Sequence, residues 1–513
     1  MMRTTLQTIF LAIIVCLAIG YGSQGALAID GSGGSVLARE KQGTDSLSSE
    51  DEDLLNELDM ELGSDEDLLN ELDMELEEVP KPKKAKKTGI SAFFEELASG
   101  FEGRFVPRAM FQLEEFEAKE EEDRDQKRLL VDYRLEGKSK VVRGNYIFNI
   151  AGWAEGGNQQ GTYAGATQFM RDIDRRRRHF ELNEINVIRS WENFDITVGK
   201  KILTMGLSTL YSPTDRISPR DLNDPLNPKT YGVWLCSLDY YYKETTITLA
   251  GIPYFSPNRV PDRSSRWTGK TGNYYFRDTA DADVEIIDAE IRDDYPPGKY
   301  VQGLLKGKTV YRGWDLFFAI FHGYSPLPVL KEESSNGKPV YQKEHPKVLT
   351  FNAGFSTTYK KYEFHGEGIF QYSYEGKDDN YLDYALGGMY KFYDLAHKIG
   401  HERIDLILEY GGEYLASEQD APDYKRSSED SRAVRNNGIG RVNFKYNEDL
   451  KWHYAIIYEF PEEGWSQEIA VEYKIRDDLV IKLGAELFDG RENTYFERWE
   501  DNDRLICQFE YSF

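Results

Sequence analysis

The last ten residues of the chain, Arg504–Phe513, read RLICQFEYSF. Apolar side chains occupy every second position and end on Phe509, Tyr511 and Phe513, while polar residues such as Glu510 fill the positions between them. Because a strand turns successive side chains to opposite faces, this period of two predicts a strand with one apolar and one polar face. An edge strand of a soluble sheet would alternate in the same way, so the stretch alone leaves two fold classes open.

The N-terminus favours one of these classes. Arg3 is followed by the apolar run Ile9–Ile19 and by small residues that end at Ala26–Ala28. This order of a charged, an apolar and a small-residue region predicts a secretory signal peptide over residues 1–28. No later stretch of the sequence reaches the roughly 20 apolar residues that a transmembrane helix needs.

The same alternation dominates the chain from about residue 101 onward, for example over 361–374, 451–460 and 465–476. The sequence is 30% charged and yet contains 34 Tyr and 27 Phe, which crowd the strand ends. Aromatic residues in two bands, apolar residues on one face and charged residues on the other are typical of a membrane barrel with a wet interior. Residues 99–513 are therefore predicted to form an all-β, transmembrane antiparallel barrel.

The connections between the expected strands give the strand number. Short and long connections should alternate between the two ends of a barrel, and we counted them from both ends of the sequence. The two counts disagree by one strand within residues 255–313, so a further strand must lie there, and Tyr300–Lys308 is the candidate. We expect 18 strands that close near residues 101 and 513, with 16 as the alternative number.

Residues 29–98 differ from the rest, with 20 acidic and 7 basic residues. The sequence DEDLLNELDMEL occurs at 51–62 and again at 65–76, and the Lys- and Pro-rich stretch Pro80–Lys87 follows as a linker. The leucines of the repeat fall on one helical stripe: Leu55, Leu58, Leu62, Leu69, Leu72 and Leu76. Two readings stay open: an acidic helical or disordered periplasmic segment that is simply solvated, or one that docks a periplasmic protein through this stripe.

Three stretches in the middle of the chain resemble a known family. They are VGKKILTMGLSTLYSPTDRISPRDLNDPLNP at Val198–Pro228, LAGIPYFSPNRVP at Leu249–Pro261 and GWDLFFAIFHGYSPLPV at Gly313–Val329. Together they resemble proteobacterial outer-membrane barrels of unassigned function, which are distantly similar to alginate-export barrels. The resemblance implies an 18-stranded barrel; the alginate-export proteins carry an anionic polysaccharide through an Arg- and Lys-lined lumen.

The first of these stretches contains a loop of about 30 residues that is stiffened by Pro213, Pro219, Pro225 and Pro228. If the loop folds inward, its charged residues would form a constriction in the pore. These residues are Asp215, Arg216, Arg220 and Asp221. A rigid external loop held by its own Arg–Asp pairs is the alternative.

A run of arginines is the second candidate for a selective site. We expect it at the start of a strand, with half of its side chains in the lumen, and we add two further cations as lumen candidates. The residues are Arg175, Arg176, Arg177, Arg178, Arg189 and Lys200. Unpaired, they would favour anions; paired with neighbouring Asp and Glu, or with lipid phosphates, they would be structural.

Signals for an enzyme are weak. His397 and His401 have the spacing of metal ligands on a helix, but they lie in a predicted turn without a third ligand. No nucleophile motif and no phosphate-binding loop is recognisable in the sequence. We expect no enzymatic activity, no cofactor and no metal, and the net charge of −26 argues against a nucleic-acid partner.

The sequence therefore predicts an outer-membrane channel of a Gram-negative bacterium, surrounded by outer-membrane lipid. It would act passively, as a pore for the diffusion or export of polar solutes, either small or polymeric. One form of this hypothesis restricts the solutes to anions. The terminal residues Phe509, Tyr511 and Phe513 resemble the signal that the barrel-assembly machinery reads. The alternative is a structural barrel whose working part is residues 29–98.

Overall fold

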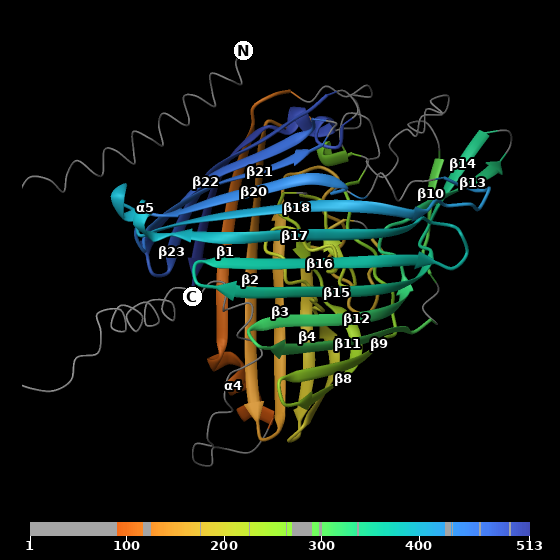
Figure 1. The fold of residues 1–513 in the computed structure, drawn as a ribbon, viewed down its shortest axis with the longest axis horizontal. Coiled ribbons are helices and arrows are strands. Elements are labelled where there is room, and N and C mark those ends of the chain that lie inside the picture. Colours follow the sequence, from red (N-terminus) through yellow and green to blue (C-terminus); the bar gives the residue numbers. More distant parts are fainter. Residues whose placement is uncertain are drawn as a thin grey trace, which may run out of the picture. The chain divides into compact units, whose positions relative to one another are not determined.

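The chain folds into a closed barrel. A computed structural model describes residues 90–115, 125–174, 176–224, 226–262, 264–268, 290–296, 300–335, 338–425, 432, 434–460, 463–491 and 494–513. In this part of the chain, 18 strands form one antiparallel sheet. The first strand, β1 (Phe101–Gln112), pairs with the last, β24 (Arg504–Ser512), so the sheet has no free edge (Figure 1). The predicted fold class and the number of 18 strands are confirmed.

The other strands follow one another around the barrel in chain order. They are β2 (Leu129–Arg143), β3 (Tyr146–Gly157), β4 (Phe180–Ser190), β5 (Phe194–Lys201), β8 (Val233–Tyr242), β9 (Thr245–Ile252), β11 (Gln302–Tyr311), β12 (Trp314–Tyr324), β15 (Lys347–Tyr359), β16 (Tyr362–Ser373), β17 (Asn380–Phe392), β18 (Arg403–Ser417), β20 (Asn436–Lys445), β21 (Leu450–Glu459), β22 (Trp465–Arg476) and β23 (Leu479–Asp489). The strand that the connection count required is β11, which begins two residues after the predicted start.

The two faces of the wall meet different solvents. In the last strand, Phe509 and Tyr511 are 42% and 41% exposed on the outside, whereas Gln508 and Glu510 line an internal cavity. Exposed aliphatic and aromatic side chains cover the outside of the other strands too, as hydrocarbon requires. The alternation of apolar outward and polar inward side chains, predicted from the last ten residues, thus extends over the whole wall.

The connections fall into two classes. Both ends of the barrel sequence and the two-residue links, such as 144–145 and 243–244, lie at one end, together with the longer link 393–402, and the longest links lie at the other end. By the usual arrangement of such barrels, the first end is periplasmic and the second is extracellular.

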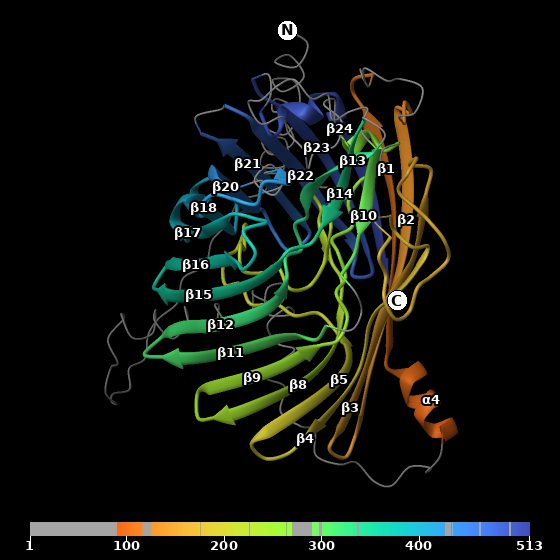
Figure 2. The ribbon, with the colours of Figure 1, turned by 90° about the vertical axis from the view of Figure 1, so that its right-hand side faces the viewer.

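Smaller elements decorate both ends of the barrel. A four-stranded sheet of β10 (Glu290–Asp294), β13 (Val329–Ser335), β14 (Lys338–Glu344) and β19 (Tyr424–Lys425) belongs to the long connections (Figure 2). Two-residue strands β6 (Arg220–Asp221) and β7 (Lys229–Thr230) pair with each other, and short helices are η3 (Arg266–Thr268), α5 (Tyr393–Lys398) and η5 (Glu497–Asn502). No helix in the described ranges is long and apolar enough to span a membrane.

Helix α4 (Ile90–Ser99) precedes the first strand and was not individually predicted. From residue 93 onward it lies against the outside of the wall, where the rings of Phe93 and Phe148 are 5.1 Å apart and Arg143 pairs with Glu96 at 2.9 Å. The signal peptide of residues 1–28 and the repeat at 51–62 and 65–76, with its leucines, lie outside the described residues.

The terminal residue completes the seam between β1 and β24. Phe513 donates its N–H to the carbonyl of Gly103 at 2.9 Å, and its own carbonyl accepts the N–H of Gly103 at 2.8 Å. A Cβ atom at Gly103 would lie 2.4 Å from the ring of Phe513, so the ring rests in the space that this glycine leaves. The last residue is therefore a working part of the closure.

Deleting Phe513 should weaken closure, because it removes two backbone hydrogen bonds and a ring contact. We expect a loss of about 2 kcal/mol of folding free energy, measured by urea titration of the band shift between folded and unfolded protein in detergent. Phe513→Tyr, which keeps the backbone and the ring, is the control. Equal stability of the truncated and full-length proteins would contradict this role.

Candidate functional site: the loop inside the lumen

Residues 202–224 and 226–232, between β5 and β8 and here called the lumen loop, lie inside the barrel. Its apolar side chains Leu203, Met205, Leu207 and Ile217 pack against inward-facing residues of four neighbouring strands. These residues are Val233, Leu235, Ala250, Ile252, Leu304, Phe317, Ala319 and Phe321. An apolar patch inside a water-filled lumen would be unfavourable, and the loop removes it from water.

Two glutamates of the wall bind the backbone of the lumen loop. Glu409 of β18 accepts the N–H groups of residues 209, 210 and 211 at 2.9, 2.8 and 2.9 Å. Glu367 of β16 accepts those of residues 207 and 208 at 2.6 and 3.1 Å. Five successive N–H groups thus surround two buried carboxylates, a concave arrangement that suits anions. His365 contacts the same Glu409 carboxylate at 2.8 Å.

The first two predicted constriction residues act within this anchorage. Asp215 accepts the N–H groups of Met205 and Gly206 at 2.5 and 3.0 Å, which closes a turn inside the loop. Arg216 donates to the hydroxyl of Tyr381 at 2.8 Å and pairs with Asp383, both on β17. Asp215 thus shapes the loop itself, and Arg216 holds the loop against the wall.

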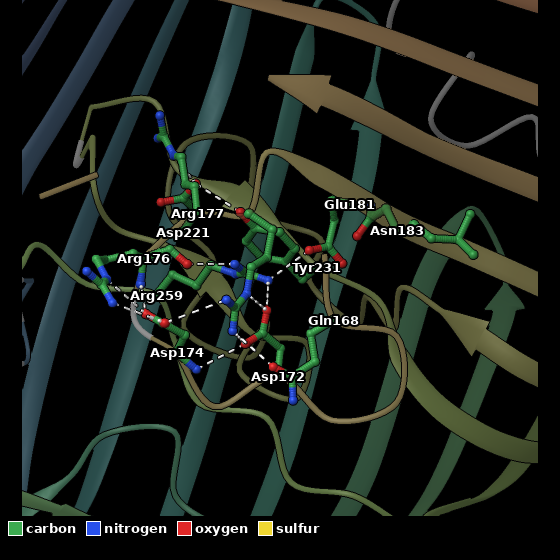
Figure 3. Close-up of polar contacts among 12 residues, drawn as sticks. Gln168, Asp172, Asp174, Arg176, Arg177, Glu181, Asn183, Asp221, Tyr231 and Arg259 are labelled. Atoms are coloured by element: carbon green, nitrogen blue, oxygen red, sulfur yellow. Dashed lines mark hydrogen bonds and ion pairs between the residues drawn. The ribbon is translucent and has the colours of Figure 1, made fainter. Parts of the chain in front are cut away.

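Asp221, another predicted constriction residue, is fully buried. Its carboxylate accepts from Arg177 at 2.6 Å and from the Tyr231 hydroxyl at 3.1 Å (Figure 3). Burial alone would raise the pKa of Asp221, but the charge and hydrogen bond of Arg177 outweigh it and keep the pKa below the ordinary value. Arg220 is half-buried, and its N–H donates to the side chain of Asn258 at 2.8 Å.

The arginine run lies in the segment before β4, which begins at Phe180, so the prediction that it starts a strand is wrong. Ion pairs with acidic residues of the same segment hold Arg176 to Asp174 at 3.2 Å and Arg178 to Asp172 at 2.9 Å. The same two aspartates also accept backbone N–H groups, Asp172 from Asp174 at 3.0 Å and Asp174 from Arg176 at 2.9 Å, and these hydrogen bonds compete with strand pairing for the backbone. Arg175 lies outside the described residues.

Arg259, which the sequence reading missed, joins this cluster to the wall. Its guanidinium lies between Asp172 at 2.9 Å and Glu181 at 2.8 Å (Figure 3). Lys200, a predicted lumen cation, binds the other oxygen of Glu181 at 2.6 Å. Arg189 is separate: it is exposed and lies over the rings of Tyr146 and Trp191. Arg177 and Arg259 thus cross-link three connections, those that carry Asp172, Asp221 and Arg259, with β4, and Lys200 adds β5.

Asp224 of the lumen loop reaches the seam of the barrel. Its two carboxylate oxygens accept from Arg108 of β1 at 2.9 Å and from Arg504 of β24 at 2.8 Å. Arg504 also pairs with Glu486 of β23. The sequence reading did not single out Asp224, because its partners are 116 and 280 residues away.

An aromatic cluster covers part of the extracellular end of the lumen. It contains Trp267, Phe488, Phe496 and Trp499, all buried, and Leu226 of the lumen loop packs against it. The extracellular loops that carry η3 and η5 supply three of these rings. Loops and wall thus share one apolar core at this end.

A polar cavity of about 380 Å³ remains beside the lumen loop. Strands β1–β3 and β20–β24 form its wall, and residues of two connections complete it: Asp224, Leu226, Asn227 and Lys229 of the lumen loop, and Tyr163 and Arg177 between β3 and β4. Its lining contains seven Arg or Lys and eight Asp or Glu residues, so the two signs nearly balance. The volume is within the range of about 300–1,000 Å³ that small-molecule sites have.

The histidines give no sign of a metal centre. His401 contacts the carbonyl of Ile399 and accepts from Trp452 at 3.4 Å. Within the described ranges, no group of three or more His, Cys, Asp or Glu side chains is placed to hold a metal ion.

Among known proteins, similarity to this chain is found in solved structures. No protein-family model and no curated protein matches the chain. Among solved structures, OccK8 (OprE) of Pseudomonas aeruginosa matches 81% of this chain and 98% of its own at 10% identity, with a TM-score of 0.41. OprB of Pseudomonas putida matches 82% and 96% at 10% identity and 0.39, and a mutant of the Rh. blastica porin matches 80% and 99% at 9% identity and 0.35.

Glu409→Gln should loosen the lumen loop, because an amide offers one acceptor atom where the carboxylate offers two. We expect a loss of about 2 kcal/mol of folding free energy and a raised single-channel conductance. Leu408→Ala, which alters the neighbouring lipid-facing position, is the control for conductance. An unchanged conductance in a destabilised Glu409→Gln protein would show that the loop does not limit passage.

Proposed function

We propose that the protein is a porin-type channel of the outer membrane through which small polar solutes diffuse. The observation that supports this is the polar cavity of about 380 Å³ between the lumen loop and one side of the wall. Charged side chains on all its sides keep it wet, while the opposite side of the lumen is filled by the loop. Surrounding lipid and insertion by the barrel-assembly machinery belong to the same proposal.

The charge pattern favours small polar solutes over an anionic polymer. Four of the predicted arginines, Arg176, Arg177, Arg178 and Arg216, are paired with carboxylates, and the cavity lining carries about as many acids as bases. An anion-selective path would need unpaired cations along it. A polymer would also have to displace the lumen loop, which five N–H groups hold on two carboxylates.

Conductance in planar bilayers tests the proposal. The wild-type protein should give small, uniform conductance steps, and Asn227→Trp should reduce them severalfold, because residue 227 is exposed to the cavity. Leu386→Trp, on the lipid-facing surface, is the matched control and should leave the steps unchanged. A folded protein without steps, or equal conductance of both variants, would refute the proposal.

Lys229 gives the channel a pH dependence. Burial and the nearby Arg134 and Arg177 lower the pKa of its ammonium to about 8, against the opposing attraction of Glu136 and Glu155. The side chain is charged below that pH and loses its charge as pH rises through 8, so the cavity becomes more negative. Reversal-potential measurements should show cation preference rising between about pH 7 and pH 9, and Lys229→Met should abolish the change.

A further inference from the structure

Three consecutive hairpins at the periplasmic end share one motif, a tyrosine followed by a cation at the first turn position. The hairpins are β8–β9, β11–β12 and β15–β16, and β9 pairs with β11 as β12 pairs with β15, so their turns are neighbours on the rim (Figure 1). The three motifs are Tyr242–Lys243, Tyr311–Arg312 and Tyr359–Lys360. We call them the tyrosine–cation hairpins.

The cations occupy strained backbone positions. Lys243, Arg312 and Lys360 have φ angles of 53°, 52° and 57°, and they are three of the four non-glycine residues with positive φ in the described ranges. Two-residue hairpin turns favour Asn, Asp or Gly at such positions. The β2–β3 hairpin of the same rim follows this rule with Gly144–Asn145. A Lys or Arg therefore costs stability here that the turn itself does not require.

Each cation lies over the ring of the tyrosine before it. The distances from the charged group to the ring centroid are 5.4 Å at Lys243, 5.2 Å at Arg312 and 5.6 Å at Lys360. The rings are themselves among the most exposed in the barrel, at 59%, 57% and 66%. They stand on the lipid-facing side of their strands, in line with outward residues such as Leu305 on β11 and Phe351 on β15.

We infer that the tyrosine–cation hairpins bind the phosphates of anionic phospholipid headgroups in the periplasmic leaflet. Tyrosine rings favour the boundary between hydrocarbon and headgroups, and a cation held beside the ring there meets the phosphate layer. Arg312 and Lys360 make the stronger sites, because their turns contain no acid, whereas Glu244 follows Lys243. Lys361, the second residue of the Lys360 turn, is paired with Asp394 at 3.8 Å, so Lys360 is the cation of this turn that remains for a phosphate.

The experiment compares the full-length protein with Arg312→Asn/Lys360→Asn in nanodiscs. Asparagine tolerates positive φ, so the turns remain while both charges are lost. Native mass spectrometry counts phosphatidylglycerol molecules retained from a mixture with phosphatidylcholine. We expect wild-type protein to retain phosphatidylglycerol preferentially, and the double variant to lose that preference by about tenfold.

The control removes two cations from another hairpin of the same rim. Lys474 and Arg476 pair with Asp477 and Asp478 at 2.7 and 3.1 Å, and Lys474→Asn/Arg476→Asn should leave lipid retention unchanged. The gel shift of folded protein verifies that all variants are folded. Equal losses in both double variants, or no lipid preference in the wild-type protein, would overturn the inference. Failure of channel activity would not affect it.

Discussion

The structure depends on one constraint: in hydrocarbon, every backbone N–H and C=O must find a partner within the protein. Eighteen antiparallel strands meet it only because β1 and β24 pair with each other. Three further features stabilise this junction between β1 and β24. Phe513 extends the pairing to the last residue, Gly103 leaves space for its ring, and Asp224 joins arginines of both strands from inside.

The lumen loop faces a related constraint. Its backbone N–H groups lose contact with bulk water when the loop packs inside the barrel, but no neighbouring strand pairs with them. The wall solves this with carboxylates, because Glu367 and Glu409 take the N–H groups that strand pairing would otherwise satisfy. Buried arginines such as Arg177 and Arg259 are paired for the same reason, as an isolated buried charge is very costly. The loop is thus polar where it meets the charged wall and apolar where it meets β8, β9, β11 and β12.

Much of the barrel could be predicted from the sequence because the strand pattern is local. The alternation ending at Phe513 and the alternating connections gave the fold and located the strand at β11. The contacts of the lumen loop could not be predicted, because Asp224 and Glu409 act on residues more than 100 positions away. The arginine run shows the limit of periodicity: Asp172 and Asp174, both visible in the sequence, accept backbone N–H groups that a strand would need for pairing.

The position of Asp224 has a consequence for how the barrel folds. Its carboxylate joins residues that are 116 positions before it and 280 positions after it. The two contacts can therefore exist together only when the first and the last strand are both in place. Before that moment the aspartate would sit beside one arginine alone. Contacts of such long sequence separation slow folding, because the chain must lose loop-closure entropy before they form. Seating of the loop and joining of the two end strands are thereby coupled into a single late event.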